Sequence, residues 1–177
     1  MPTSMTKQQL AARIKQVAYL EGEFTLRSGA ISHYYLDKYL FETQPDILVE
    51  LGRLFAERTG EADLIAGAEL GAVSLAAATS MAAGKPYVIV RNAKKGYGTG
   101  NQIEGALPAG AKVLLVEDIV TSGGQVIEAA QALAAAGAEV LKIVATIDRL
   151  QGGRENIEGA GLAFESLLTR EDLGITG

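Results

Sequence analysis

The stretch from residue 113 to residue 136 constrains the fold of this chain more than any other part. It opens with four apolar residues, Val113 to Val116, a run that is typical of a strand buried on both faces of a sheet. The acidic pair Glu117 and Asp118 follows, then the small-residue loop Thr121–Gly124, and then an Ala-rich helical pattern. Because a strand of this kind needs a layer of helices on each side, the stretch predicts an α/β fold.

Strand and helix patterns recur along the middle of the chain. They are the strands 63–67, 85–91 and 140–147 and the helices 46–58 and about 72–83. Their alternation predicts a central, mostly buried parallel sheet flanked by helices on both faces. At 177 residues the chain is expected to form a single domain, 1–177, with its core at about 45–150.

Shorter patterns occupy the two ends of the chain. Residues 6–20 are expected to form an amphipathic helix that ends near Gly22, and residues 24–39 a β-hairpin or an extended arm. Towards the C-terminus we expect a loop at 151–154, a short edge strand and a closing helix near residues 171–173.

Charge and composition exclude several classes of function. The net charge of −5, from 16 basic and 21 acidic residues, argues against a general binder of nucleic acid or anionic membranes. With no cysteine and one histidine, His33, a thiolate metal site, a cysteine nucleophile and a catalytic triad have little basis. The N-terminus lacks the apolar region of a signal peptide, and no apolar run approaches membrane-spanning length. We expect a cytoplasmic enzyme or binding protein.

The loop after Val116 has the chemistry of an anion pocket beside a diol site. Free backbone N–H groups, the hydroxyls of Thr121 and Ser122 and the positive end of the helix can converge on one phosphate. Glu117 and Asp118 would repel a phosphate and suit neighbouring hydroxyls or a hydrated cation. A ribose 5-phosphate fits both halves, whereas the structural alternative is an ordinary strand-to-helix turn with a capping hydroxyl.

Two longer segments have both a structural and a functional interpretation. Residues 92–106 are polar and Gly-rich, and three basic residues stand at their start: Arg91, Lys94 and Lys95. This segment is either a solvated loop or a mobile lid that closes over a polyanion. The aromatic residues in 24–39 form either a flap packed on the core or a cover for a planar ligand, with Arg27 supplying positive charge.

Two positions at strand ends also have both a structural and a functional interpretation. Residues 67–71 connect a strand to a helix and are either a second anion site or a small-residue turn for close packing. Arg149 follows the strand 140–147 after Asp148, at an edge where ligands gather in doubly wound sheets, but a structural ion pair would explain it equally well.

Two segments resemble known sequence signatures. Val113–Gln125 resembles the phosphoribosyl-pyrophosphate (PRPP) signature of the type I phosphoribosyltransferases. Phe24–Gly29, followed by Ser32, Tyr34, Tyr35 and Asp37, resembles the N-terminal signature of the orotate phosphoribosyltransferases. The resemblance implies a type I phosphoribosyltransferase-like sheet with a small N-terminal hood, mainly residues 20–42 plus C-terminal residues. It also implies transfer of a 5-phosphoribosyl group from PRPP to orotate in pyrimidine biosynthesis, with orotidine 5′-monophosphate and pyrophosphate as products.

The resemblance further implies roles for individual residues. Catalysis falls to Arg91, Lys95, Glu117 and Asp118. Contacts with PRPP fall to Glu69, Leu70, Gly71, Arg91, Lys94, Lys95, Tyr97, Glu117, Asp118, Ile119, Val120, Thr121, Ser122, Gly123, Gly124 and Gln125. Contacts with orotate fall to Arg27, Tyr35, Leu36, Thr121 and Arg149. Mg²⁺ would be held mainly through ligand and water, without a direct protein ligand. A homodimer would bring lid residues into the neighbouring active site, and no nucleic acid or membrane partner is expected.

Two departures from the family pattern keep other interpretations open. Asn92 stands where many members have Lys, and Tyr97 where many have His. One rival is a phosphoribosyltransferase for another base, such as a purine. The other is a non-catalytic PRPP- or nucleotide-sensing regulatory module, against which the basic lid argues.

Overall fold

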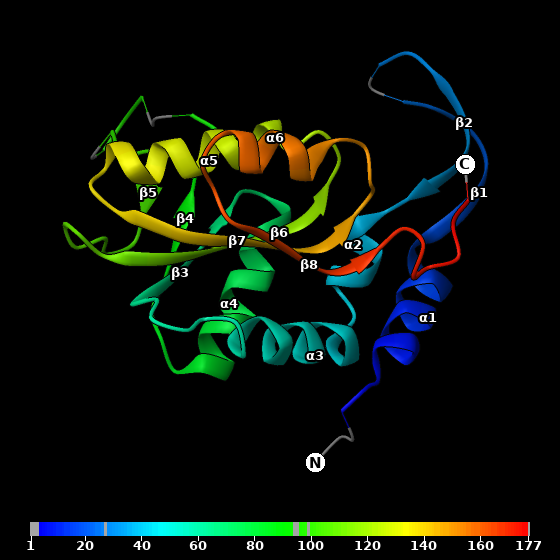
Figure 1. The fold of residues 1–177 in the computed structure, drawn as a ribbon, viewed down its shortest axis with the longest axis horizontal. Coiled ribbons are helices and arrows are strands. Elements are labelled where there is room, and N and C mark those ends of the chain that lie inside the picture. The colour runs from blue at the N-terminus through cyan, green and yellow to red at the C-terminus, as the bar shows by residue number, and fades with distance from the viewer. Residues whose placement is uncertain (1–3, 27, 94–95, 99, 177) are drawn as a thin grey trace.

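A six-stranded sheet forms the centre of the molecule, with its strands in the order β5-β4-β3-β6-β7-β8 (Figure 1). The structure is a computed structural model that describes residues 4–26, 28–93, 96–98 and 100–176. The strands are β3 (Leu64–Ala68), β4 (Tyr87–Val90), β5 (Ile103–Glu104), β6 (Lys112–Val120), β7 (Glu139–Asp148) and β8 (Phe164–Thr169). All neighbouring strands are parallel except the short edge strand β5, which is antiparallel to β4. The predicted parallel sheet is therefore confirmed.

The apolar run at the start of β6 is buried on both faces, as expected from its sequence. The side chains of Val113, Leu114, Leu115 and Val116 are all at most 1% exposed. Leu114 and Val116 belong to one hydrophobic core, whereas Val113 and Leu115 belong to a second core on the other face of the sheet. Successive side chains of a strand point to opposite faces, so a sheet enclosed between two cores requires a continuous apolar run.

Helices cover both faces of the sheet (Figure 1). Helices α3 (Pro45–Ala56) and α4 (Gly71–Ala83) lie on one face, and α5 (Gly124–Ala135) and α6 (Gly153–Gly159) lie on the other. Pro45 occupies the first turn of α3, where its missing N–H costs nothing. Within the described part of the chain, no helix is long and apolar enough to cross a lipid bilayer.

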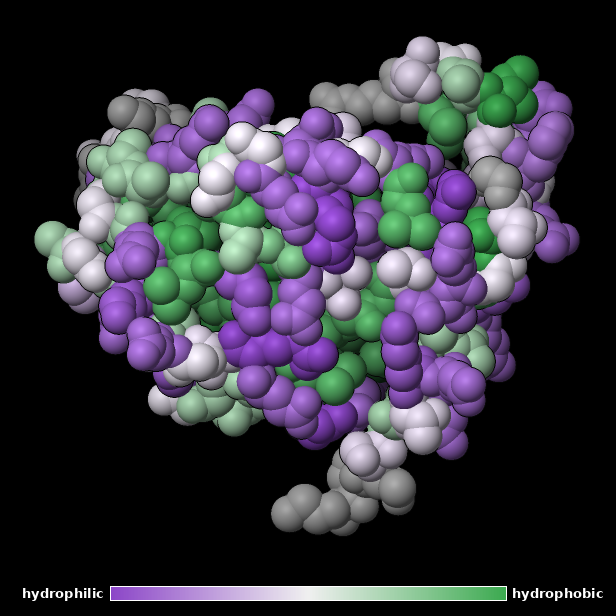
Figure 2. All heavy atoms as spheres, viewed as in Figure 1, coloured by the Kyte–Doolittle hydropathy of each residue, from purple (hydrophilic) through white to green (hydrophobic). Residues whose placement is uncertain are grey.

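The N-terminal segment packs at one end of the sheet and includes the predicted hairpin. It consists of α1 (Lys7–Ala18), β1 (Tyr19–Thr25), β2 (Ile31–Leu36) and α2 (Lys38–Glu42), with β1 and β2 antiparallel. Figure 2 shows this hairpin protruding from the body of the molecule, with apolar side chains near its tip. Ile31 on β2 is 63% exposed, so this part of the hairpin is not packed on the core.

Three expectations about element boundaries were wrong, and one helix was not anticipated. Helix α1 ends at Ala18 instead of near Gly22, because the chain enters β1 directly at Tyr19. Helix α2 was not predicted, and the expected loop at 151–154 instead leads into α6. Residues 170–174 form a turn instead of a closing helix, in which Asp172 accepts a hydrogen bond from the Thr169 N–H.

Candidate active site

Two adjoining cavities lie at the carboxyl ends of the central strands. One, of about 310 Å³, is lined by residues that follow β3 and β4, by the end of β6, by the start of α5 and by α2. The other, of about 290 Å³, is formed by residues around the loop from β6 to α5. Glu117 and Gln125 line both cavities. The chain leaves β3 for β4 on one side and then returns to β6 on the other, so the cavities occupy the switch point where ligands of such sheets bind.

The smaller cavity is built by the predicted anion loop, residues 121–125, here called the phosphate loop. Gly123 adopts φ +82°, which favours glycine, and no side chain caps the α5 N-terminus that follows it. The first N–H groups of a helix have no acceptor within the helix and are the positive end of its dipole. The loop therefore offers the backbone donors that a phosphate requires.

Helix α6 supports the phosphate loop from behind. A Cβ atom on Gly153 would lie 2.3 Å from Val120 Cγ1 and 2.6 Å from the carbonyl oxygen of Thr121, so only glycine permits this close packing. The side-chain amide of Asn156 donates a hydrogen bond of 2.9 Å to the carbonyl oxygen of Ser122. Both contacts fix the backbone of the loop on the side away from its cavity.

The acidic pair lies where the two cavities meet, and both side chains are buried. The exposed fraction is 9% for Glu117 and 3% for Asp118. Glu117 Oε1 accepts the N–H of Asp118 at 2.8 Å, and Asp118 Oδ1 accepts the N–H of Ile119 at 2.5 Å. Burial, followed by the charge of Asp118, raises the pKa of Glu117 well above its usual value. The pair thus combines an acid that is readily protonated with a carboxylate that is held in place.

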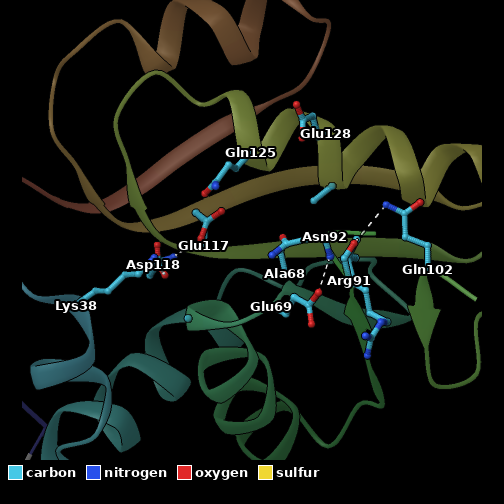
Figure 3. Close-up of a pocket in the computed structure, with 13 residues that line it drawn as sticks. Lys38, Ala68, Glu69, Arg91, Asn92, Gln102, Glu117, Asp118, Gln125 and Glu128 are labelled. Atoms are coloured by element: carbon cyan, nitrogen blue, oxygen red, sulfur yellow. Dashed lines mark hydrogen bonds and ion pairs between the residues drawn. The ribbon is translucent and has the colours of Figure 1, made fainter. Parts of the chain in front are cut away.

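Two residues of α2 complete the acidic site and were missed by sequence reasoning. Lys38 Nζ forms an ion pair of 3.0 Å with Asp118 Oδ2, and Figure 3 shows its side chain extending from α2 toward the acidic pair. Glu42, one turn further along α2, is 3% exposed. Burial, and then the charge of Asp118, raise its pKa to about 9. No local pattern marks either residue, since both reach the site through the packing of α2 against α4 and the ion pair of Lys38 with Asp118.

The loops after β3 and β4 form the far wall of the larger cavity. Glu69 Oε1 accepts the backbone N–H of Asn92 at 2.6 Å, which joins the two loops. The guanidinium of Arg91 lies 3.8 Å from Glu104 of β5 and points away from Glu117 and Asp118 (Figure 3). Arg91 therefore borders its own cavity without directing its charge at the acidic pair.

Of the remaining residues expected to contact PRPP, Gly71 and those of the phosphate loop line the cavities. Leu70 is 72% exposed and precedes Gly71 at the start of α4, and Tyr97 is 74% exposed. Ile119, Val120, Thr121, Ser122, Gly123, Gly124 and Gln125 line the smaller cavity. Lys94 and Lys95 lie outside the described residues.

The residues expected to contact orotate are distributed between the hood and the end of β7. Arg149 donates a hydrogen bond of 2.7 Å to the hydroxyl of Tyr34, and its guanidinium lies 5.5 Å from the centre of that ring. Tyr35 is 45% exposed, and Leu36 is buried in the core. Arg27 lies outside the described residues. The structure thus brings Arg149 to the hood strand β2 through Tyr34, a residue to which the sequence analysis gave no binding role.

The larger cavity presents oxygen donors that suit a hydrated divalent cation. Within the residues that the structure describes, no group of three or more His, Cys, Asp or Glu side chains is arranged to hold a metal ion directly. Carboxylates of Glu69, Glu117 and Asp118 do line the cavity. Mg²⁺ keeps several waters and prefers carboxylates and substrate phosphates, so this donor set fits an ion carried by substrate oxygens and water.

Comparison with known proteins identifies relatives along nearly the whole chain. Residues 41–161 match the phosphoribosyl transferase domain family. An orotate phosphoribosyltransferase of Natronomonas pharaonis is 47% identical over 170 residues, which are 96% of this chain and 98% of the relative. One of Methanocaldococcus jannaschii is 41% identical, again over 96% of this chain and 98% of the relative.

Solved structures agree with these sequence relatives. The orotate phosphoribosyltransferase of Mycobacterium tuberculosis H37Rv in complex with PRPP has a TM-score of 0.82 and 31% identity, and the match covers 96% of this chain and 99% of that one. The orotate phosphoribosyltransferase of Aeropyrum pernix has a TM-score of 0.81 at 27% identity, with coverage of 93% and 95%. An adenine phosphoribosyltransferase of Leishmania donovani, at 17% identity and a TM-score of 0.73, shares the fold.

Proposed function

The chain belongs to the orotate phosphoribosyltransferases, within the phosphoribosyl transferase family, and from that premise we propose how its two cavities divide the reaction. The enzyme transfers a 5-phosphoribosyl group from PRPP to N1 of orotate. The products are orotidine 5′-monophosphate, a precursor of pyrimidine nucleotides, and pyrophosphate.

The observation that carries the assignment is the junction of the two cavities at Glu117. PRPP has a 5′-phosphate at one end of its ribose and a pyrophosphate at the other. The phosphate loop supplies backbone donors for the 5′-phosphate in the smaller cavity. The acidic pair, at the junction, accepts hydrogen bonds from the ribose hydroxyls, and the loop Glu69–Gly71 borders the pyrophosphate in the larger cavity.

The transfer depends on positioning and charge, without a protein nucleophile. As the bond to pyrophosphate breaks, the ribose acquires oxocarbenium-like positive charge and the leaving group acquires negative charge. Fixed groups that face these charges lower the barrier because they need no reorganisation during the reaction. Glu117 and Asp118 hold the ribose through its hydroxyls, the carboxylate of Asp118 supplies the negative charge beside it, and the basic residues Arg91 and Lys95 neutralise the expelled pyrophosphate.

Orotate is assigned to the space between the hood and the end of β7. Its carboxylate is planar and suits the guanidinium of Arg149, which already donates to Tyr34 at this place. Thr121 is the first residue of the phosphate loop and lines the smaller cavity; it is also assigned to orotate. The assignments of Arg27, Tyr35 and Leu36 to orotate rest on the family signature.

A homodimer with an exchanged lid is part of the same proposal. The guanidinium of Arg91 points away from the acidic pair of its own chain, which supports a role in the site of a partner subunit (Figure 3). Lys94, Lys95 and Tyr97 follow it in the lid, residues 92–106. The lid would close over the pyrophosphate of the neighbouring site, exclude water and add positive charge.

Mg²⁺ is the proposed cofactor, and it would enter with PRPP. When bound, it would neutralise charge on the pyrophosphate. Glu117 and Asp118 are placed to accept hydrogen bonds from its waters. We propose a cytoplasmic location as well, because both substrates are anionic metabolites that do not cross a bilayer unaided; cell fractionation tests this location.

The function is tested by following the absorbance of orotate in a mixture of the purified protein, orotate, PRPP and Mg²⁺. We expect a decrease that requires all components and is matched by the appearance of pyrophosphate. No change under conditions where PRPP binds would contradict orotate as the acceptor. A panel of other bases would then separate a phosphoribosyltransferase of different specificity from a PRPP sensor.

A further inference from the structure

We propose that Lys38 is a positioning residue for the transfer, which acts by fixing the carboxylate of Asp118 for the ribose hydroxyls while Glu42 supports this contact from inside the protein. The inference rests on the proposed role of Asp118. It adds to the site a short helix, α2, that precedes the domain matched by the family and that sequence reasoning did not connect with the reaction.

Asp118 is anchored through both of its carboxylate oxygens. Its Oδ1 accepts the N–H of Ile119, and its Oδ2 pairs with Lys38 Nζ at 3.0 Å. The Asp118 side chain is 4% exposed and that of Lys38 is 33% exposed, so the pair lies at the cavity wall with the carboxylate on the inner side. Without Lys38, one of the two oxygens would lose its charged partner, and the carboxylate could turn about its last bond.

The space around Asp118 Oδ2 is closed on the side of α4. A Cβ atom added to Gly71, the first residue of α4, would lie 2.0 Å from Asp118 Oδ2 and 3.4 Å from Glu42 Oε2. Asp118 is therefore packed against the start of α4, and rotation in that direction is blocked. Lys38 restrains it on the open, cavity side. Because Gly71 also ends the loop assigned to pyrophosphate, the Lys38–Asp118 contact lies between the ribose and the leaving group.

Glu42 is buried beside this contact and is uncharged. This side chain is 3% exposed, and its Oε1 has no hydrogen-bond partner among the described residues. Its pKa of about 9, raised by burial and by the charge of Asp118, makes Glu42 a neutral acid at pH 7. A neutral Glu42 does not compete for the ammonium group. For Lys38, burial lowers the pKa, but the charge and hydrogen bond of Asp118 outweigh it and raise the pKa overall, so Lys38 stays charged.

The other cation that lines the cavity, within the described residues, does not replace Lys38. Arg91 pairs with Glu104 at 3.8 Å and points away from the acidic pair (Figure 3). Asp118 thus depends on Lys38 for its charged partner in this part of the structure. An effect of removing Lys38 should therefore reach the substrate through Asp118.

A double-mutant cycle tests this dependence. Lys38→Met, Asp118→Asn and the double variant are compared by kcat/KM for PRPP and by PRPP affinity in calorimetry. We expect Lys38→Met alone to lower kcat/KM for PRPP roughly 10- to 100-fold, as is usual for removal of a coupled partner. In the Asp118→Asn background the same change should cost less than about twofold. Equal losses in both backgrounds would overturn the inference.

Two further variants separate positioning from general damage. Lys38→Arg keeps the charge and should recover most of the PRPP kcat/KM, with the KM for orotate unchanged in all Lys38 variants. Lys7→Met is the matched control, because Lys7 also forms a 3.0 Å ion pair, with Asp172, away from both cavities. It should behave as the unmodified protein. If Lys38→Arg is no better than Lys38→Met, or if the KM for orotate rises equally, the positioning role is wrong.

These experiments also separate a failure of the proposed function from a failure of the positioning role of Lys38. If the unmodified protein binds PRPP but does not consume orotate, the proposed function fails, and the calorimetric cycle still tests Lys38. If the unmodified protein is active and the cycle is additive, the positioning role fails while the function stands.

Discussion

Glu42 is a single carboxylic acid enclosed between α2, β6 and the start of α4. Its pKa of about 9 means that folding favours its proton, because burial, and then the nearby Asp118, disfavour the charged form. The folded-state pKa is raised above that of the unfolded chain. The stability that this group contributes is therefore fully present below its ordinary pKa and is lost as the pH rises toward 9.

Glu42→Gln should remove this pH dependence, since glutamine resembles the protonated acid. Relative to the unmodified protein, the variant should gain roughly 1 kcal/mol of unfolding free energy for each pH unit between about pH 5 and pH 8. Thermal unfolding measured across this range checks the gain. A difference in Tm that stays constant with pH would contradict a neutral Glu42.

The matched control is Glu50→Gln, the same substitution at another buried glutamate. Glu50 is 6% exposed and forms an ion pair of 2.6 Å with Arg53. Loss of this pair should lower Tm at pH 8 instead of raising it.

At the scale of elements, the site depends on segments that differ in how far the sequence reveals them. The strand β6, the acidic pair and the phosphate loop are local: a buried apolar run, two acids and a Gly-Gly turn stand side by side in the sequence. Helices α2 and α6, with 5 and 7 residues, are too short to show a periodic pattern of apolar positions. They are held by contacts with distant segments, such as Lys38 with Asp118 and Asn156 with Ser122, which no local pattern displays.

The contact of α6 with the phosphate loop should influence PRPP alone. Asn156→Ala removes the hydrogen bond to the carbonyl oxygen of Ser122 and should raise the KM for PRPP about 2- to 10-fold. The KM for orotate should not change, because the hydrogen bond holds Ser122, which is assigned to PRPP and not to orotate. Steady-state kinetics with each substrate varied in turn measures both values.

Glu155→Ala is the control on the same helix, because this neighbouring side chain is exposed. It should leave both KM values unchanged. An equal rise for PRPP and orotate in Asn156→Ala would indicate general loosening of the fold instead of a specific support of the loop.

At the scale of the whole molecule, the chain supplies both a cavity and a basic lid, and the proposal places them in different subunits. The cavity is enclosed by elements from both halves of the sheet, and Arg91 lines it but directs its guanidinium toward Glu104 of β5. A partner's lid would then complete each site. This arrangement predicts that two inactive chains can restore each other.

Mixing Lys95→Ala chains with Asp118→Asn chains tests the exchange of lids. In a mixed dimer, one site has both an intact acidic pair and an intact lid, while the other has neither. Random reassortment of equal amounts should therefore recover about a quarter of the unmodified activity. No recovery, in a mixture shown to contain mixed dimers, would contradict the exchanged lid.

The central claim is that the two cavities divide PRPP at Glu117, and the most direct test is a crystal structure of the protein with PRPP. The account predicts the 5′-phosphate on the backbone N–H groups of Gly123–Gln125, and the ribose hydroxyls on Glu117 and Asp118. The pyrophosphate should lie beside Glu69–Gly71. A 5′-phosphate bound in the larger cavity, with the phosphate loop empty, would contradict the account.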